Sequence, residues 1–261
     1  MAVGEITPAK ATEWLLYISI AGTLLLVILL VRRDLYRGYR CFFLYQVFNA
    51  VQTCAALVPI PERYVIARYA VGQTIKTVLA SLVVLEIYRL SLQERKALAR
   101  FGRNVVGYAL GISFLASLIR LFFYGTVPPD QVVLHYTLAV EGVVDSTILI
   151  FLCLMGIFLA WFPVQMKKSL VAYFLGFVFY FSALWVILLL AIRHTAARDV
   201  ATVNVIGEVI TLACIIFWIK GMRKEDDDNT TTTGHRWNPE EMERLKTQLD
   251  EINAGLERLA R

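Results

Sequence analysis

Six charged side chains of this 261-residue chain lie at membrane depth within long apolar stretches, three of them basic and three acidic. A charge at membrane depth is costly, so such residues indicate either a site or a buried ion pair. Glu141 and Asp145 are four residues apart and therefore share one face of a helix. Carboxylates beside basic groups have the chemistry to bind an ion, a proton or a small polar ligand. The candidate residues are Arg68, Lys76, Arg120, Glu141, Asp145 and Glu208.

Two interpretations of these charges are open. In the first, they line a polar cavity that faces outward and binds a small ligand, an ion or a proton. In the second, they form buried ion pairs that fix how the helices pack, and the equal numbers of acids and bases favour this interpretation. The exception is local, because Glu141 and Asp145 both compete for the single Lys76 near mid-membrane depth. We therefore expect one of these two carboxyl groups to be protonated or to face water.

The sequence holds none of the common catalytic or cofactor motifs. HExxH, GxSxG and the Walker loop are absent, and the three histidines are isolated from one another. Lys220 is the only lysine in the last apolar run and lies at its end, which argues against a retinal Schiff base. The four cysteines fall in apolar runs without a CxxC spacing, so we expect neither disulfides nor a metal site. These features predict a non-enzymatic protein without a cofactor or a metal.

The elements that must position these residues are membrane helices. Hydrophobic residues make up 58% of the chain and charged residues 18%, whereas soluble domains have roughly 45–50% and about 25%. These values exclude a soluble globular domain, a disordered chain and a nucleic-acid-binding domain. They predict an all-α integral membrane protein with seven transmembrane helices in residues 14–224, after a short extracytoplasmic segment, residues 1–13. The seven apolar runs are Trp14–Val31, Cys41–Leu57, Tyr64–Leu90, Asn104–Tyr124, Val132–Phe162, Ser169–Ile192 and Val200–Lys220.

Basic residues set the direction of these helices. The first, third and fifth loops and the segment after the last run are rich in lysine and arginine, whereas the loops between them are poor in both. The positive-inside rule then places the N-terminus outside and the C-terminus in the cytoplasm of a multi-pass protein of the cell (inner) membrane. This arrangement explains much of the net charge of +5 without a nucleic-acid partner. Near the cytoplasmic end of the third run, Glu86 and Arg89 are predicted to pair within one helix.

The C-terminal tail has a different composition. Residues 225–237 are acidic and threonine-rich, which predicts a flexible, solvated linker. Asn238 and Pro239 then predict the start of a helix. Its apolar residues recur at spacings of 3, 4, 3, 4 and 3, which is the a/d seam of a cytoplasmic coiled coil over residues 238–261. The seam residues are Met242, Leu245, Leu249, Ile252, Leu256 and Leu259.

A seam of about three heptads needs a partner, since isolated helices of this length are marginal. Self-association into a homo-oligomer is favoured, and docking on the bundle or on a cytoplasmic protein partner is the alternative. The layout resembles the membrane input modules of bacterial seven-helix sensors, in topology and without a shared motif. The resemblance implies a receptor-like protein that senses a small ligand at the outward polar cluster and signals through its tail. The alternatives are an ion or small-solute channel or transporter, and a structural membrane assembly protein.

Overall fold

The computed structural model describes residues 8–59, 61–92, 108, 111, 115, 132–161, 164–193, 197–223, 230–233 and 238–259. This part of the chain is mostly helical, which confirms the predicted all-α class. The helices are α1 (Pro8–Arg32), α2 (Arg40–Ala56), α3 (Glu62–Ser91), α5 (Val132–Trp161), α6 (Lys168–Arg193), α7 (Ala197–Gly221) and α9 (Pro239–Leu259). The 3-10 turn η1 (Leu35–Arg37) joins α1 to α2, and there are two short strands, β1 (Val164–Lys167) and β2 (Thr230–Thr233).

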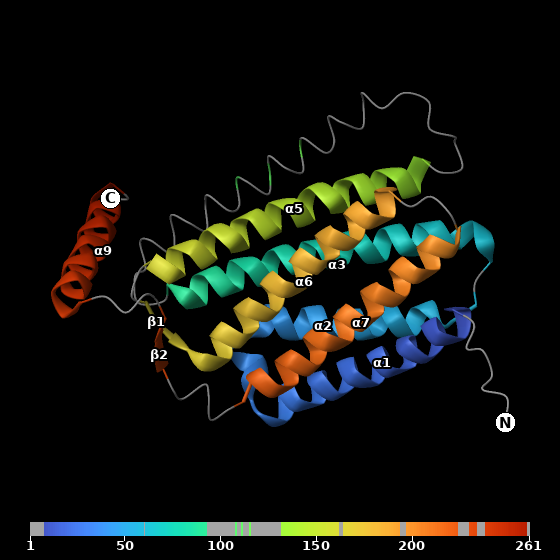
Figure 1. The fold of residues 1–261 in the computed structure, drawn as a ribbon, viewed down its shortest axis with the longest axis horizontal. Coiled ribbons are helices and arrows are strands. Elements are labelled where there is room, and N and C mark those ends of the chain that lie inside the picture. The colour runs from blue at the N-terminus through green and yellow to red at the C-terminus, as the bar shows by residue number, and fades with distance from the viewer. Residues whose placement is uncertain are drawn as a thin grey trace.

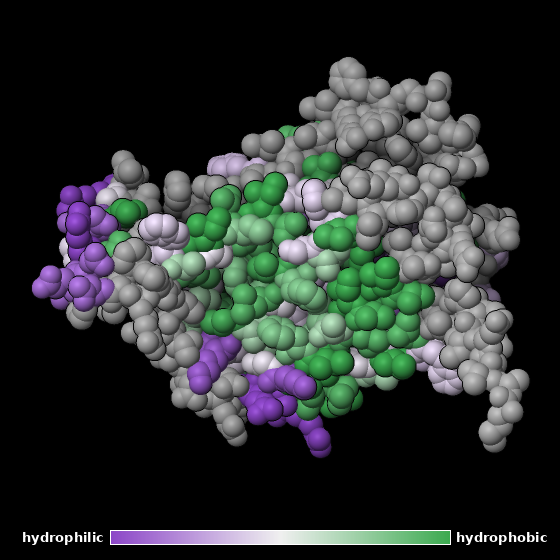
Figure 2. Space-filling model, in the orientation of Figure 1, coloured by the Kyte–Doolittle hydropathy of each residue, from purple (hydrophilic) through white to green (hydrophobic). Residues whose placement is uncertain are grey.

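Four described helices are long and apolar enough to cross a membrane. They are Trp14–Arg32 of α1, Tyr64–Ser91 of α3, Val140–Trp161 of α5 and Lys168–Ile187 of α6. Large apolar side chains stay exposed along them, and Figure 2 shows a broad apolar surface over the middle of the bundle. Hydrophilic residues gather on α9 and at the adjacent end of the bundle (Figure 2). This distribution is that of a membrane protein whose outer surface faces lipid.

Six of the seven predicted apolar runs coincide with α1, α2, α3, α5, α6 and α7. The remaining run, Asn104–Tyr124, lies outside the described residues except for Tyr108, Gly111 and Leu115, and Arg120 lies outside them as well. All six helices run lengthwise in one bundle (Figure 1). Each helix packs against two neighbours in the order α1, α2, α3, α5, α6, α7 and back to α1, with α3 and α6 in contact across this ring.

Helices α3 and α5 run in the same direction. Near the start of both, Gln73 of α3 contacts Glu141 of α5, and further along both, the rings of Tyr88 and Phe151 lie 5.7 Å apart. Contacts that advance together along two helices are those of a parallel pair, and Figure 1 shows the same direction. The end of α3 at Ser91 and the start of α5 at Val132 therefore lie at opposite ends of the bundle.

An aromatic cluster packs α2, α6 and α7 together. The ring of Phe177 lies 5.0 Å from that of Trp218 and 5.4 Å from that of Tyr173, and Phe42 lies 4.8 Å from Tyr173. Phe177 and Tyr173 are four residues apart, so they form one stripe on α6. Gly176 lies beside this stripe, where an added Cβ would be 2.1 Å from Nε1 of Trp218. Glycine is therefore required for the indole to pack against the α6 backbone.

The segment predicted to be a flexible linker contains a strand. Thr230–Thr233 (β2) pairs antiparallel with Val164–Lys167 (β1), which lies between α5 and α6, and Gln165 is opposite Thr232. The polarity of this segment predicts a linker. Threonine is also β-branched, however, and it favours extended backbone when a partner strand is available. The tail is thus held at the end of the bundle where α6 begins (Figure 1).

Helix α9 is present where the sequence predicts it, from Pro239 to Leu259. It stands apart from the bundle helices, at the end where β1 and β2 lie (Figure 1). Of its seam residues, Leu245 is half-buried and Ile252 is 49% exposed. An exposed isoleucine on a helix rich in charged residues is compatible with a partner. The coiled coil itself stays a prediction.

Candidate functional site

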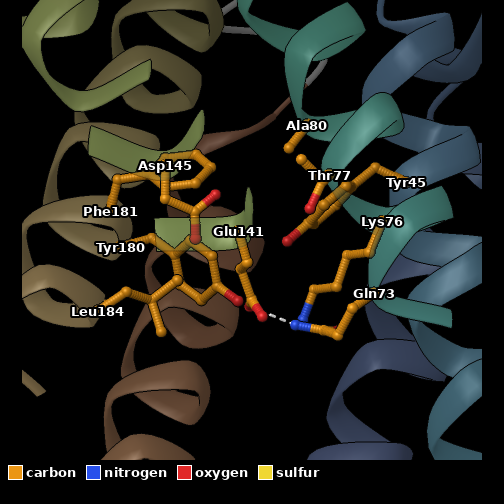
Figure 3. A pocket seen from close by; sticks show the side chains of 10 residues that line it. All are labelled: Tyr45, Gln73, Lys76, Thr77, Ala80, Glu141, Asp145, Tyr180, Phe181 and Leu184. Carbon is orange, nitrogen blue, oxygen red and sulfur yellow. Dashed lines mark hydrogen bonds between the residues drawn. The ribbon is translucent and has the colours of Figure 1, made fainter. Parts of the chain in front are cut away.

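A polar cavity of about 90 Å³ lies between α2, α3, α5 and α6. Three of its lining side chains carry charge, and four more bring hydroxyl or amide groups. The polar set is Lys76, Glu141, Asp145, Tyr45, Gln73, Thr77 and Tyr180, and the apolar remainder is Ala80, Phe181 and Leu184 (Figure 3).

Helical spacing places these side chains. On α3, positions 73, 76, 77 and 80 are three and four residues apart, so they face one side of the helix. On α5, Glu141 and Asp145 share a face for the same reason, as the sequence predicts, and both line the cavity. Tyr180 of α6 continues the aromatic stripe of Tyr173 and Phe177, and its hydroxyl lies on the Glu141 side of the cavity (Figure 3). The cavity therefore forms where regular faces of α3, α5 and α6 meet, and Tyr45 of α2 completes its lining.

Glu141 lies in a chain of hydrogen bonds that joins three helices. The amide of Gln73 donates from Nε2 to Oε1 of Glu141, and the Tyr69 hydroxyl donates to Oε2 over 3.4 Å. Gln52 of α2 donates in turn to Oε1 of Gln73 over 3.3 Å. Gly72 permits this approach, because an added Cβ would be 2.7 Å from Nε2 of Gln52. The chain fixes the Glu141 carboxylate on one side of the cavity.

Lys76 and Asp145 complete the charged part of the cavity. The Lys76 ammonium interacts with both carboxylates, and Tyr180 lies against both Lys76 and Tyr45. In Figure 3 the Lys76 amine points toward Glu141, while Asp145 lies one turn further along α5. No hydrogen-bond donor among the described residues reaches the Asp145 carboxyl group. The fully ionised set has two negative charges and one positive charge.

The structure brings together three of the six predicted site residues. Lys76, Glu141 and Asp145 line one cavity, whereas Glu208 is half-buried on α7 and does not line it. Arg68 is engaged elsewhere: its guanidinium donates to the backbone oxygens of Ala55 at 2.8 Å and Val58 at 3.0 Å. Arg68 therefore caps the C-terminal end of α2, where carbonyl groups lack partners within the helix.

Glu86 caps the other end of the same helix. Its carboxylate accepts hydrogen bonds from the backbone nitrogens of Cys41 at 3.0 Å and Phe42 at 3.2 Å, and from the Tyr173 hydroxyl at 3.2 Å. These partners lie on α2 and α6, whereas the sequence predicted a pair with Arg89 on the same helix. A carboxylate at a helix N-terminus and a guanidinium at its C-terminus both complement the helix dipole.

Tyr45 and Tyr180 are two polar cavity residues that the sequence did not reveal. Both are more than nine-tenths buried, and both lie in apolar runs where a tyrosine is most simply interpreted as packing. A buried tyrosine hydroxyl usually has a hydrogen-bond partner. A tyrosine within a membrane run was thus a signal, beside the charged residues, of a polar interior at this depth.

The described part of the chain has no group of three or more His, Cys, Asp or Glu side chains arranged to hold a metal ion. We found no protein-family model, curated protein or solved structure that matches this chain.

Proposed function

We propose that the protein is a non-enzymatic, receptor-like seven-helix membrane protein that senses a small ligand in the cavity and reports through its cytoplasmic tail. The observation that carries this proposal is the charged cavity itself. Lys76, Glu141 and Asp145 come from two helices and meet around one space, in a chain whose surface faces lipid. Charges at membrane depth that surround a cavity are typical of a binding site or an ion pathway.

The parallel direction of α3 and α5 supports the count of seven helices. Ser91 and Val132 lie at opposite ends of the bundle, and the sequence between them contains the apolar run Asn104–Tyr124. At 1.5 Å per residue, a helix of that run would be about 31 Å long, which matches the hydrocarbon thickness of a bilayer. With this helix the chain would cross the membrane seven times, so its N-terminus and C-terminus would lie on opposite sides. The basic loops favour a cytoplasmic C-terminus.

Helix α6 supports a route from the cavity to the tail. Tyr180 of α6 lines the cavity, and Lys168, the first residue of α6, directly follows β1. β1 pairs with β2 of the tail, and the Ser169 hydroxyl donates to the backbone oxygen of Arg223 over 3.0 Å. A shift of α6 caused by binding would therefore be transmitted to the segment that precedes α9.

A spin label on α9 tests this proposal. Glu251 is exposed, so a Glu251→Cys variant without the four native cysteines can carry the label. The distance between labels of two copies is measured in acidic and alkaline buffer, and in NaCl, KCl and choline chloride. We expect a condition-dependent change of distance that is lost in Asp145→Asn and kept in Glu208→Gln, the matched control outside the cavity.

Other results would favour the alternative functions. A constant label distance together with ion flux into proteoliposomes that Asp145→Asn abolishes would replace the sensor with a channel or transporter. A constant distance without flux would leave a structural assembly protein.

A further inference from the structure

We propose that the cavity binds one monovalent positive charge, either a proton or an alkali cation. The proposal names the ligand class of the cavity, and it rests on the proposed function only for the consequence of binding.

Among the described residues that line the cavity, the charges are short of one positive charge. Glu141 and Asp145 together carry two negative charges when ionised, and Lys76 supplies one positive charge. An uncompensated charge in a low-dielectric interior is strongly unfavourable, so the cavity is stable when a proton or a cation neutralises the surplus. Neutralisation by a distant arginine is not available from Arg68, whose guanidinium is bound to the end of α2.

The volume selects a small ligand. A cavity of about 90 Å³ has room for several water molecules, since one water needs roughly 10–15 Å³ of such space. Pockets for drug-sized organic ligands measure roughly 300–1,000 Å³. The space therefore admits a proton with bound water, or an alkali cation that keeps a few water ligands, and it excludes larger organic molecules.

The polar groups of the cavity supply oxygen ligands at the position of the surplus charge. Asp145 has no donor among the described residues, whereas Glu141 already accepts from Gln73 and Tyr69. The hydroxyl groups of Tyr45 and Tyr180, both more than nine-tenths buried, point into the same space (Figure 3). Carboxylate, hydroxyl and water oxygens are the ligands that hard cations prefer. Asp145 is therefore the residue that receives the charge.

Each helix packed around Asp145 contributes titratable or charged groups. α5 itself adds Glu141, and the other helices supply two tyrosines that line the cavity, one tyrosine bound to Glu141, one lysine and one cysteine. They are Tyr45 of α2, Tyr69 and Lys76 of α3, Tyr180 of α6 and, next to Tyr45, Cys214 of α7. Lys76 is the only one of these groups that is positively charged, so the charge count depends on it.

The test measures charge uptake on the purified full-length protein. Infrared difference spectra between acidic and alkaline buffer detect a protonated carboxyl group, and calorimetric titration with NaCl or KCl, against choline chloride, detects an alkali cation. We expect uptake of one charge per chain, its loss in Asp145→Asn, and uptake of two charges in Lys76→Gln. Glu208→Gln, a carboxyl group outside the cavity, should leave the uptake at one.

The two sources give different results. A carboxyl band that disappears in Asp145→Asn, without heat from NaCl or KCl, identifies a proton, whereas saturable heat that suppresses the band identifies a cation. Glu141→Gln keeps an oxygen for Gln73 and provides a second neutral variant if Asp145→Asn does not fold. Neither band nor heat, or an unchanged uptake of one in Lys76→Gln, would overturn the proposal. Uptake without movement of α9 would leave this inference standing and contradict the sensor function.

Discussion

Glu86 shows how one side chain can cap the start of a short helix on a neighbouring segment. Its carboxylate accepts from two backbone nitrogens at the start of α2 and from the Tyr173 hydroxyl. Arg68 of the same helix, α3, binds the carbonyl groups at the other end of α2. The two residues are 18 positions apart, which is about 27 Å along a helix, and the 17 residues of α2 span about 26 Å. The distance between Arg68 and Glu86 along α3 therefore matches the length of α2, and α3 caps both ends of α2.

Glu86→Gln should destabilise the protein by about 1–3 kcal/mol, because a neutral amide leaves part of this donor set unsatisfied. The free energy of unfolding in detergent, measured by denaturant titration, checks this prediction. Arg89→Gln is the matched control, since Arg89 is exposed and a pair with it would contribute only about 0–1 kcal/mol. If the two variants lowered the free energy of unfolding equally, the hydrogen bonds of Glu86 to α2 would not contribute more to stability than the pair with Arg89.

Some residues of the candidate site could be predicted from the sequence, and others could not. Lys76, Glu141 and Asp145 were found because charges in apolar runs are visible in one dimension. Their meeting around a cavity and the contribution of Tyr180 depend on which helices are neighbours, and no periodicity within one run contains that information. Glu86 was assigned to Arg89 for the same reason, because local spacing shows only partners on the same helix.

At the scale of the elements, one glycine on α6 and one on α7 allow the two helices to approach each other closely. Gly176 faces the indole of Trp218, and at Gly221 an added Cβ would be 2.6 Å from Cβ of Ala172. These contacts let the aromatic cluster pack without a gap between the two helices. Helix association in membranes depends on such close packing, since burial from water contributes little there.

Gly176→Ala should lower stability, since the new Cβ would overlap Trp218 and overpacking typically costs about 1–3 kcal/mol. The melting temperature in detergent measures the effect, and adding Trp218→Phe, which removes the pyrrole ring of the indole, should restore part of the loss. Gly255→Ala in α9 is the control, because nothing lies within 4 Å of that position and alanine favours a helix by about 1 kcal/mol. If Gly176→Ala melts at the wild-type temperature, the close contact is not required.

The elements themselves were largely predictable. Long apolar runs gave six helices near their observed positions, because membrane helices are selected by length and composition. The strand at Thr230–Thr233 was missed, since its partner lies between α5 and α6, more than 60 residues earlier in the chain. A polar segment without periodicity is assigned to a linker unless its partner strand is known.

For the whole molecule, the proposed homo-oligomer depends on α9. Deletion of residues 238–261 should reduce the mass of the detergent-solubilised particle to that of a single chain, since the heptad seam is removed and the bundle is left intact. Light scattering coupled to size-exclusion chromatography measures this mass. Replacement of Ile252 by aspartate should have the same effect with only one residue changed, and an unchanged mass in both variants would exclude α9 as the oligomerisation element.

The pairing of β1 with β2 also limits how far α9 can travel. Six peptide units separate Thr233 from Pro239, so the start of α9 stays within about 22 Å of the strand pair. This short connection between β2 and α9 confines the heptad seam to a small volume near the end of its own bundle. In the proposed homo-oligomer, the seams of two neighbouring bundles would therefore meet at a high effective concentration, which would allow a seam of only three heptads to hold the bundles together.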